Sequence, residues 1–191
     1  MFYKTCSAMR KFDRKHYSGI FNLLHRSSLR PFSIKQNAAE AHFRLGILLS
    51  RAGEHKEARE ELTRCIQIDP KFEKVWFNRG VLNATLGDLE EAMADYNEEI
   101  RLQPNYAQTW YSRGNLRRKT QDFEGALEDF SQAIELRPEF PEALSNRADI
   151  NKILGKVTEA IRDYKKALLI APPDWVYRDK VEETVRQLKR Q

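Results

Sequence analysis

The 191-residue sequence contains little cysteine and glycine and no long apolar run. Its two cysteines, Cys6 and Cys65, are too few for a disulfide framework and do not form the close pair typical of metal sites. Its eight glycines form no GxGxxG or P-loop motif, so nothing supports dinucleotide or nucleoside-triphosphate chemistry. No stretch reaches the roughly 18 uninterrupted apolar residues of a membrane-spanning helix, and we therefore expect no transmembrane segment.

The ionisable side chains show no grouping that supports catalysis. The four histidines are scattered without an HExxH motif, and no nucleophile, base and oxyanion-stabilising group can be assigned as a set. The sequence therefore predicts no enzyme activity, no metal site, no cofactor and no small-molecule substrate. Hydrophobic residues make up 41% of the chain and charged residues 32%, which is typical of a folded, well-solvated protein rather than a disordered one.

The body of the chain repeats with a period of 34 residues. Prolines recur at this interval, and so do two columns of small residues, one column of large residues and one column that begins with a histidine. The columns are Pro70, Pro104, Pro138 and Pro172; Gly46, Gly80, Gly114 and Ala148; Ala58, Ala92, Ala126 and Ala160; Leu62, Tyr96, Phe130 and Tyr164; and His42, Trp76, Trp110 and Leu144. A fixed period of this length predicts a solenoid in which each unit packs on its neighbours.

These columns resemble the tetratricopeptide repeat (TPR), whose pattern is W-x2-L-G-x2-Y, then A-x3-F, then P over 34 residues. The resemblance implies an all-α, right-handed superhelical solenoid of helix-turn-helix repeats. It divides the body into units at 39–72, 73–106, 107–140 and 141–174, with a capping helix in 175–191. Arg79, Arg113 and Arg147 depart from the pattern because they replace the leucine before the small-residue column, which makes the first helices more polar.

Apolar periodicity predicts two helices in each unit. In the second unit they are expected near Val75–Leu86 and Leu89–Leu102, with Gly87 in the turn and Asp88 at the new N-cap. Gln121 takes the place of the turn glycine in the third unit, so we expect slight strain there. The small residues should let the two helices approach closely, and the large residue of the fourth column should fill the space beside them.

A few single residues also carry expectations. The capping helix is predicted to start after Asp174, with an apolar stripe formed by Tyr177, Val181, Val185 and Leu188. In the repeats we interpret three features from their context alone: Cys65 as a buried packing thiol, Glu98 and Glu99 as surface acids, and the basic run Arg117, Arg118 and Lys119 as a solvated helix end.

The family resemblance implies that the first helix of each unit lines a concave groove. The positions that face inward are largely apolar in the first two units and polar, with a positive lean, in the last two. They are Phe43, Ile47, Phe77, Asn78 and Val81, followed by Tyr111, Asn115, Arg118, Lys119, Asn146 and Lys152. This division predicts a non-catalytic adaptor or assembly factor that binds a protein or an extended peptide with a hydrophobic end and an acidic end. Asn78 and Asn146 are expected to hold the peptide backbone.

Other functions stay open at this point. The partner could lie on the convex face or the edges, and the array could be a structural subunit of a larger complex. RNA binding through Arg118 and Lys119 is a third alternative, and the oligomeric state is not indicated. One TPR variety grips C-terminal carboxylates of heat-shock chaperones with a Lys, and an Asn four residues later, early in the array. Apolar residues stand at both sites here, Phe43 and Ile47 or, one unit later, Phe77 and Val81, so no clamp of that type is expected.

Positive charge is concentrated in a leader, residues 1–38. The whole chain has a net charge of +5, but the leader holds eight basic side chains and one acidic, whereas residues 39–191 hold 25 basic and 27 acidic. This near-neutral body argues against nucleic-acid binding. The leader is rich in Arg, Lys and Ser and forms a basic amphipathic pattern, as mitochondrial presequences do.

The segment Arg30-Pro31-Phe32-Ser33 is similar to a presequence processing site that is cut after Phe32. We therefore expect a cleaved leader and a location in the mitochondrial matrix, with the cytoplasm as the alternative. A retained leader helix could instead cap the first repeat, lie in the groove or rest on an anionic lipid surface.

Overall fold

The structure is a computed structural model that describes residues 31–190, with side chains from residue 34. Most of the predicted leader lies outside the described residues. Within them the chain forms helices and turns and no strand. The helices are α3 (Pro31–Arg51), α4 (His55–Ile68), α5 (Val75–Leu86), α6 (Leu89–Leu102), α7 (Ala107–Lys119), α8 (Phe123–Leu136), α9 (Pro141–Ile153), α10 (Val157–Ile170) and α11 (Arg178–Leu188). Among residues 31–190, no helix is both long and apolar enough to cross a membrane.

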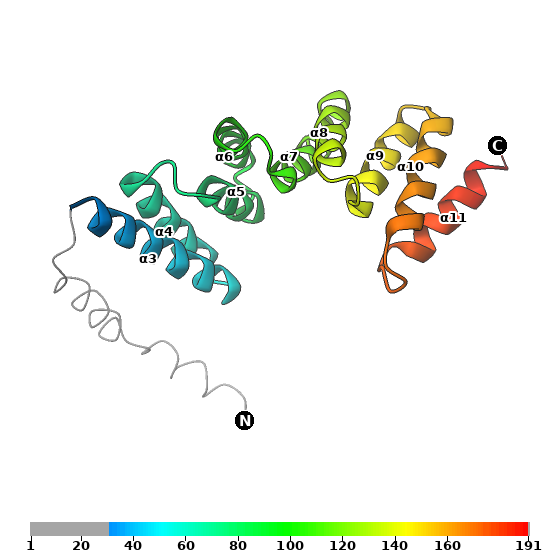
Figure 1. The fold of residues 1–191 in the computed structure, drawn as a ribbon. Coiled ribbons are helices and arrows are strands. Elements are labelled where there is room, and N and C mark those ends of the chain that lie inside the picture. The colour runs from blue at the N-terminus through cyan, green and yellow to red at the C-terminus, as the bar shows by residue number, and fades with distance from the viewer. Residues whose placement is uncertain (1–30, 191) are drawn as a thin grey trace.

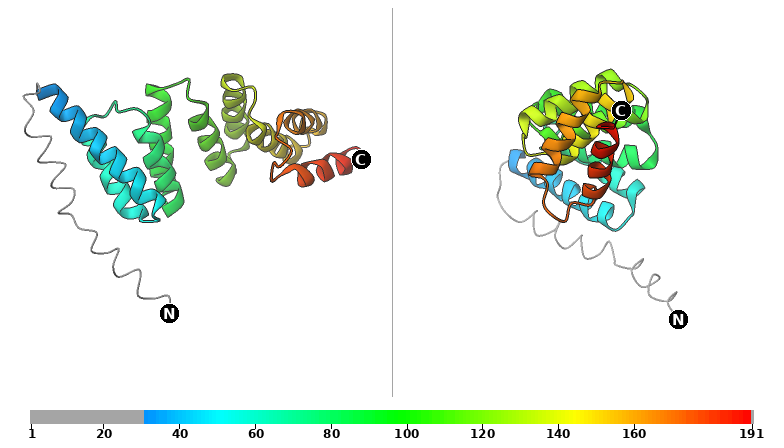
Figure 2. Two further views of the ribbon diagram at one scale, coloured as in Figure 1. Left: turned by 60° about the horizontal axis from the view of Figure 1, so that its bottom comes forward. Right: turned by 90° about the vertical axis from the view of Figure 1, so that its right-hand side faces the viewer.

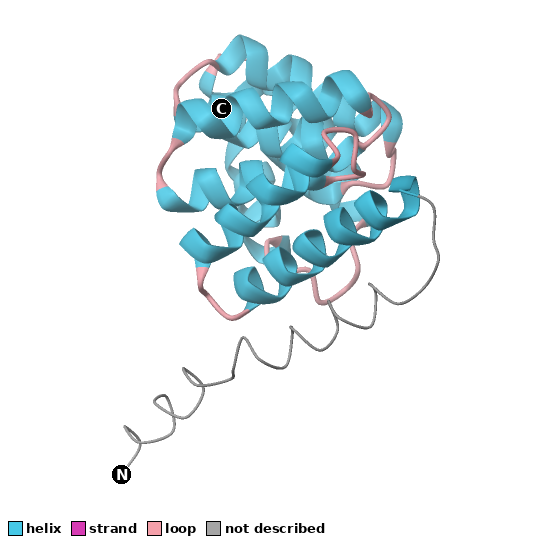
Figure 3. Cartoon of the chain, turned by 90° about the vertical axis from the view of Figure 1, so that its left-hand side faces the viewer, coloured by secondary structure: helices cyan, strands magenta, loops and turns pink. Residues whose placement is uncertain are grey.

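The helices stack in chain order into an elongated array of helical hairpins (Figures 1 and 2). Each first helix packs on the second helix of its own unit, and it also contacts the first helix of the next unit, as α3 does α5, α5 does α7 and α7 does α9. The first helices therefore line one face, called here the concave face, and the short loops lie at the ends of the hairpins (Figure 3). The predicted all-α solenoid is confirmed, and α5 and α6 have the predicted bounds.

The small-residue column allows close contact between the helices of a unit. A Cβ atom placed on Gly80 would lie 2.8 Å from the Tyr96 ring, and one on Gly114 would lie 2.8 Å from the Phe130 ring. These distances are shorter than carbon–carbon contact, so the aromatic side chain occupies the space that a larger residue would need. The packing predicted from the two columns is confirmed.

The turns inside the units require a left-handed residue. Gly87 has φ 93°, and Gln121, which replaces glycine in the third unit, has φ 63°. A non-glycine residue is strained in this region, so the expectation for Gln121 is confirmed. Asp88 is the N-cap of α6, but its carboxylate bonds the Arg59 guanidinium instead of capping the helix.

The three arginines that depart from the repeat pattern form a ladder along the array. The guanidinium of Arg113 donates two hydrogen bonds to Asp129, at 3.0 and 2.7 Å, and Asp129 is fully buried. The same bonds join Arg79 to Asp95 and Arg147 to Asp163. The third nitrogen of each guanidinium reaches the second helix of the preceding unit: Arg79 donates to Thr63, Arg113 to Asn97 and Arg147 to Ser131. These polar residues therefore tie neighbouring units together.

The ladder ends where the array ends. One period before Arg79 stands Leu45, and one period after Arg147 stands Val181, which is only 3% exposed in α11. Arg79 and Arg113 also stack on Trp76 and Trp110, with the guanidinium carbon 4.9 Å from each ring centroid.

The start of the capping helix differs from the prediction. Its N-cap is Tyr177 rather than Asp174, because two successive turns, closed by the bonds from the Trp175 and Arg178 amides to the Pro172 and Trp175 carbonyls, precede α11. Trp175 is buried, whereas Tyr177 is 52% exposed and does not join the stripe. Val181, Val185 and Leu188 are buried as expected, so the helix does cover the last unit.

The leader boundary predicted between residues 38 and 39 falls inside α3, which runs unbroken from Pro31. Ala39, the first residue of the first unit, is fully buried, whereas residues 34–36 are exposed. A cut after Phe32 would therefore remove only the first two residues of α3 and leave the packed part of the helix intact.

Candidate functional site

The aromatic residues predicted for the groove pack against the aromatic residue that ends their own unit, in the loop that leads to the next one. The ring centroid of Phe43 lies 5.0 Å from that of Phe72, and Tyr111 lies 4.7 Å from Phe140. Phe77 contacts Tyr106 edge-on at 5.3 Å. All three predicted residues are half-buried. Removing one of these rings would therefore loosen the array as well as change the concave face.

Three predicted polar residues meet between the third and fourth units. The Asn146 amide nitrogen donates to the Asn115 side-chain oxygen at 2.8 Å and to the Tyr111 hydroxyl at 3.3 Å. Asn78 behaves differently, because its amide nitrogen donates to the Lys74 carbonyl of its own helix at 2.7 Å. A peptide backbone that bonded these amide nitrogens would have to displace internal hydrogen bonds.

The cations of the concave face are not equivalent. Asp149 accepts a hydrogen bond from the Tyr164 hydroxyl and lies 3.9 Å from a guanidinium nitrogen of Arg118 and 4.0 Å from the ammonium group of Lys152. Burial raises the pKa of Tyr164, and the hydrogen bond to Asp149 raises it further. Lys119 forms no ion pair with any residue in 34–190. The positive lean predicted for this half of the groove is thus strongest at Lys119.

A cavity of about 300 Å³ brings together residues that the sequence analysis placed in separate halves of the groove. It lies between α5 and α7, over α6. Its apolar wall is formed by Val81, Ala84, Leu89, Leu116 and Tyr96, and its polar rim by Thr85, Ser112, Asn115 and Lys119. Tyr96 is buried at this cavity, and burial followed by the charge of Asp95 raises the pKa of its hydroxyl. Ile47 and Phe43 do not line this cavity.

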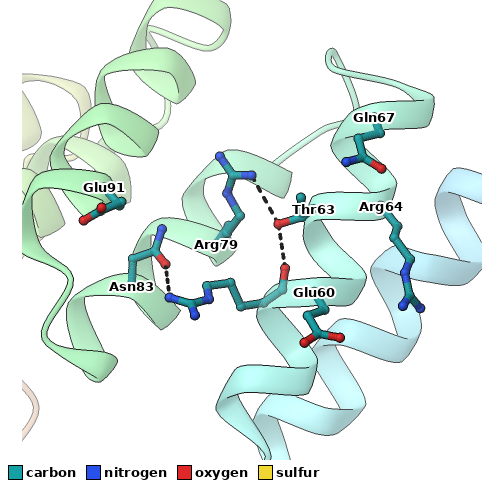
Figure 4. Close-up of a pocket in the computed structure, with 8 residues that line it drawn as sticks. Glu60, Thr63, Arg64, Gln67, Arg79, Asn83 and Glu91 are labelled. Carbon is teal, nitrogen blue, oxygen red and sulfur yellow. Dashed lines mark hydrogen bonds between the residues drawn. The ribbon is translucent and has the colours of Figure 1, made fainter.

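A larger cavity of about 530 Å³ is formed by α4, α5 and α6, and it was not anticipated (Figure 4). Three arginines line it, but each already has a carboxylate partner: Arg59 has Asp88, Arg64 has Glu61 and Arg79 has Asp95. Figure 4 shows Arg79 directed toward Thr63, so its remaining nitrogen is also engaged. The 34-residue spacing of the arginine and aspartate columns was the available signal for the Arg79–Asp95 pair, and the other two pairs have no periodic counterpart.

Two predictions about single charged residues are wrong. Glu99 is not a surface acid: it is 1% exposed, and its carboxylate accepts the Phe77 amide hydrogen at 3.2 Å, at the start of α5. Burial raises the pKa of Glu99. Glu98, its neighbour, does face solvent and pairs with Arg101.

Arg117 is not solvated either, because its guanidinium lies 3.2 Å from buried Asp129 and donates to the Gly125 carbonyl at 3.0 Å. Its neighbours Arg118 and Lys119 are exposed as predicted. Cys65 is fully buried as expected, and burial, with a smaller effect of Asp69, raises its pKa to about 12. Within residues 34–190, no group of three or more His, Cys, Asp or Glu side chains is placed to hold a metal ion.

Comparison with known proteins gives one family for the whole body. Tetratricopeptide repeat models match residues 39–72, 73–106, 107–140 and 141–174. No curated protein gives a significant match.

Solved structures show the same architecture. The crystal structure of MamA is similar with a TM-score of 0.67 and 22% identity, over 80% of this chain and 82% of that chain. A tetratricopeptide repeat protein from Parabacteroides merdae has a TM-score of 0.66 and 26% identity, over 78% of this chain and 57% of that one. The first TPR of Spaghetti (RPAP3), bound to the HSP90 peptide SRMEEVD, has a TM-score of 0.61 and 25% identity, over 62% and 94% of the two chains.

Proposed function

The chain belongs to the tetratricopeptide repeat family, and we propose that it is an adaptor that binds an extended segment of a partner protein on its concave face. Repeat solenoids use their extended concave surfaces for binding. The RPAP3 array, which shares the fold, is bound to a short peptide that contains both apolar and acidic residues. A peptide ligand is therefore compatible with an array of these dimensions.

One observation carries the proposal. The concave face has an exposed apolar side chain and an exposed cation that are available to a partner, whereas the arginines of the larger cavity already have carboxylate partners. Val81 is a 38% exposed apolar side chain, and Lys119 lines the same cavity as an exposed cation without an ion-pair partner in residues 34–190. The arginines of the larger cavity are paired inside the array. A partner with apolar and acidic side chains can therefore gain contacts at Val81 and Lys119 without displacing an internal ion pair.

The direction of the partner follows from the distribution of charge. Among the predicted groove residues, the apolar side chains Phe43, Ile47, Phe77 and Val81 lie on α3 and α5, although α9 also exposes one apolar side chain, Ile153, at 56%. The exposed cations Arg118, Lys119 and Lys152 lie toward the last two units. The hydrophobic end of the partner segment is accordingly proposed to lie on α3 and α5 and its acidic end on α7 and α9.

Affinity capture with two charge-reversed double variants tests this function. Arg118→Glu with Lys119→Glu reverses two neighbouring cations on the concave face, and Lys165→Glu with Lys166→Glu makes the same change at two exposed positions on α10. The first variant should capture at least tenfold less of the specific partner than the wild type does. The second variant should capture as much as the wild type. Equal retention by both variants would contradict a concave binding face.

We also propose that residues 1–32 are a cleaved mitochondrial address, which would bring the array to the matrix. The charge of the leader and the Arg30-Pro31-Phe32-Ser33 segment support this, and removal of the first two residues of α3 would leave the packed units whole. The intact mass of the endogenous protein should correspond to a chain that begins at or near Ser33. A chain that still begins near Met1 would contradict the proposal.

A further inference from the structure

The cavity on the concave face lies at the junction of the second and third units, where two side chains are short. At the next junction the Asn146 amide bridges to Asn115 at 2.8 Å and ties α9 to α7. One period earlier, the corresponding residues are Ser112 and Val81. A hydroxymethyl and an isopropyl group cannot form that bridge, and a cavity of about 300 Å³ lies beside them.

Most of the apolar side chains that line this cavity are aliphatic. Val81, Leu89 and Leu116 contribute only carbon atoms, and Leu116 is 5% exposed, so this wall is held firmly by the core. The volume lies at the lower end of the range for ligand pockets. Such a pocket suits one branched aliphatic side chain, whose burial is worth at least tenfold in affinity over a small polar one.

The rim adds a charge requirement. Lys119 is exposed and lacks an ion-pair partner in the described part of the chain, whereas Arg118 and Lys152 both lie near Asp149. A partner carboxylate next to the aliphatic residue in the cavity would therefore form its ion pair with Lys119. One cation at a solvent-exposed rim is worth about a few-fold in affinity.

The geometry points to a partner motif in which a leucine-like residue enters the cavity between α5 and α7 and the acidic residue that follows it pairs with Lys119. This inference rests on the proposed function and adds the side-chain class that the concave face selects. The acid belongs to an internal Asp or Glu, because the first helices continue on both sides of the cavity, with α3 beside α5 and α9 beside α7, and admit a chain that continues in both directions.

Four acetylated probes test the motif. Each is added to the isotopically labelled full chain, and binding is measured by NMR. Acetyl-Leu-Asp-amide should shift the backbone amides of Thr85, Ser112 and Lys119. Acetyl-Ser-Asp-amide should bind at least tenfold more weakly, because the cavity stays empty. Acetyl-Leu-Asn-amide should bind about threefold more weakly, because the charge is lost. Acetyl-leucine with a free carboxylate represents a chain end and should bind no better than the acidic dipeptide.

Three protein variants sharpen the test. Ser112→Asn introduces the larger amide found at Asn146, and it should reduce binding of acetyl-Leu-Asp-amide at least fivefold. Lys119→Glu should abolish the preference for Asp over Asn in the probe. Lys166→Glu, an exposed cation on α10, is the matched control and should leave both properties unchanged.

Several outcomes would overturn the inference. They are equal binding of all four probes, tighter binding of acetyl-leucine than of the dipeptide, or shifts confined to other parts of the chain. Shifts at Tyr111 and Asn146 alone would reject the cavity while leaving concave binding intact. Absence of binding by every probe would reject the motif, and the capture experiment with the charge-reversed double variants would still decide the proposed function.

Discussion

The arginine ladder and the concave face obey different rules. In the ladder, the same bond recurs with the period of the sequence, as from Arg79 to Asp95 and from Arg113 to Asp129. On the concave face, corresponding residues change from unit to unit, as from Ser112 to Asn146, and so do their contacts. Periodic residues hold the array together, and residues that break the period give one junction a surface that the others lack.

The largest expected effect comes from breaking the ladder. Asp129→Ala leaves the guanidinium of Arg113 without its buried carboxylate and removes a second partner of Arg117. Loss of one member of a buried ion pair costs about 3–5 kcal/mol. Urea unfolding followed by circular dichroism should show this loss.

A matched control for that variant lies on the same helix. Glu135 is exposed on α8, and Glu135→Ala should change stability by about 0.5 kcal/mol or less. If Asp129→Ala proved as mild as Glu135→Ala, the buried Arg113–Asp129 pair would not stabilise the array.

The next effect concerns the small-residue column. Gly114→Leu would force its side chain into the Phe130 ring, which lies 2.8 Å from the position of a Cβ atom. Overpacking of this kind costs about 2 kcal/mol or more. Gly114→Ala should cost less, because Ala148 occupies the same column in the fourth unit and is fully buried. Thermal unfolding measures both, and an unshifted curve for the leucine variant would refute the packing described here.

A smaller effect depends on pH and on Glu99. Burial raises the pKa of this carboxyl above its ordinary value, so the folded state favours the protonated form. Its stabilising contribution is present at low pH and is lost as the pH rises through the folded-state pKa. Glu99→Gln imitates the protonated form and should be more stable than the wild type at pH 7.

The stability difference between Glu99→Gln and the wild type should shrink as the pH is lowered, and denaturant unfolding at several pH values measures it. Gln retains an oxygen that can accept the Phe77 amide hydrogen, so the comparison isolates the charge. A difference that does not change with pH would show that the carboxylate is not penalised by burial.

The smallest expected effect on stability belongs to the concave face. Lys119→Glu changes an exposed side chain without an ion-pair partner in residues 34–190, so the free energy of unfolding should change by about 0.5 kcal/mol or less. Partner binding should nevertheless weaken severalfold. A large loss of stability would show that Lys119 is structural, and it would remove the contrast between the ladder and the concave face.

The 34-residue period of the sequence predicted the features that depend on residues close together in the chain. The bounds of α5 and α6, the close approach at Gly80 and Gly114, and the left-handed Gln121 all follow from residues within one unit. The arginine ladder is also periodic, but from the sequence its arginines were interpreted only as polar departures from the repeat pattern. Pairing the arginine column with the aspartate column sixteen residues later would have found it.

The side-chain contacts along the concave face and at the end of the array could not be predicted in the same way. Phe77 was assigned to the groove, yet its exposure depends on Tyr106, which follows the next proline and packs against it. Whether Asn146 faces a ligand or Asn115 depends on the distance between two first helices. The N-cap of α11 moved from Asp174 to Tyr177 because two turns and a buried Trp175 precede the helix. Such details depend on three-dimensional packing, which the period alone does not specify.

Site-specific photo-crosslinking tests whether the partner binds on the concave face. A benzoylphenylalanine is placed either at Val81 on α5 or at Ala94 on α6, which are both exposed and belong to the same unit. If the concave face binds the partner, irradiation should attach the partner to position 81 and not to position 94. Crosslinking at position 94 with none at position 81 would contradict binding on the concave face.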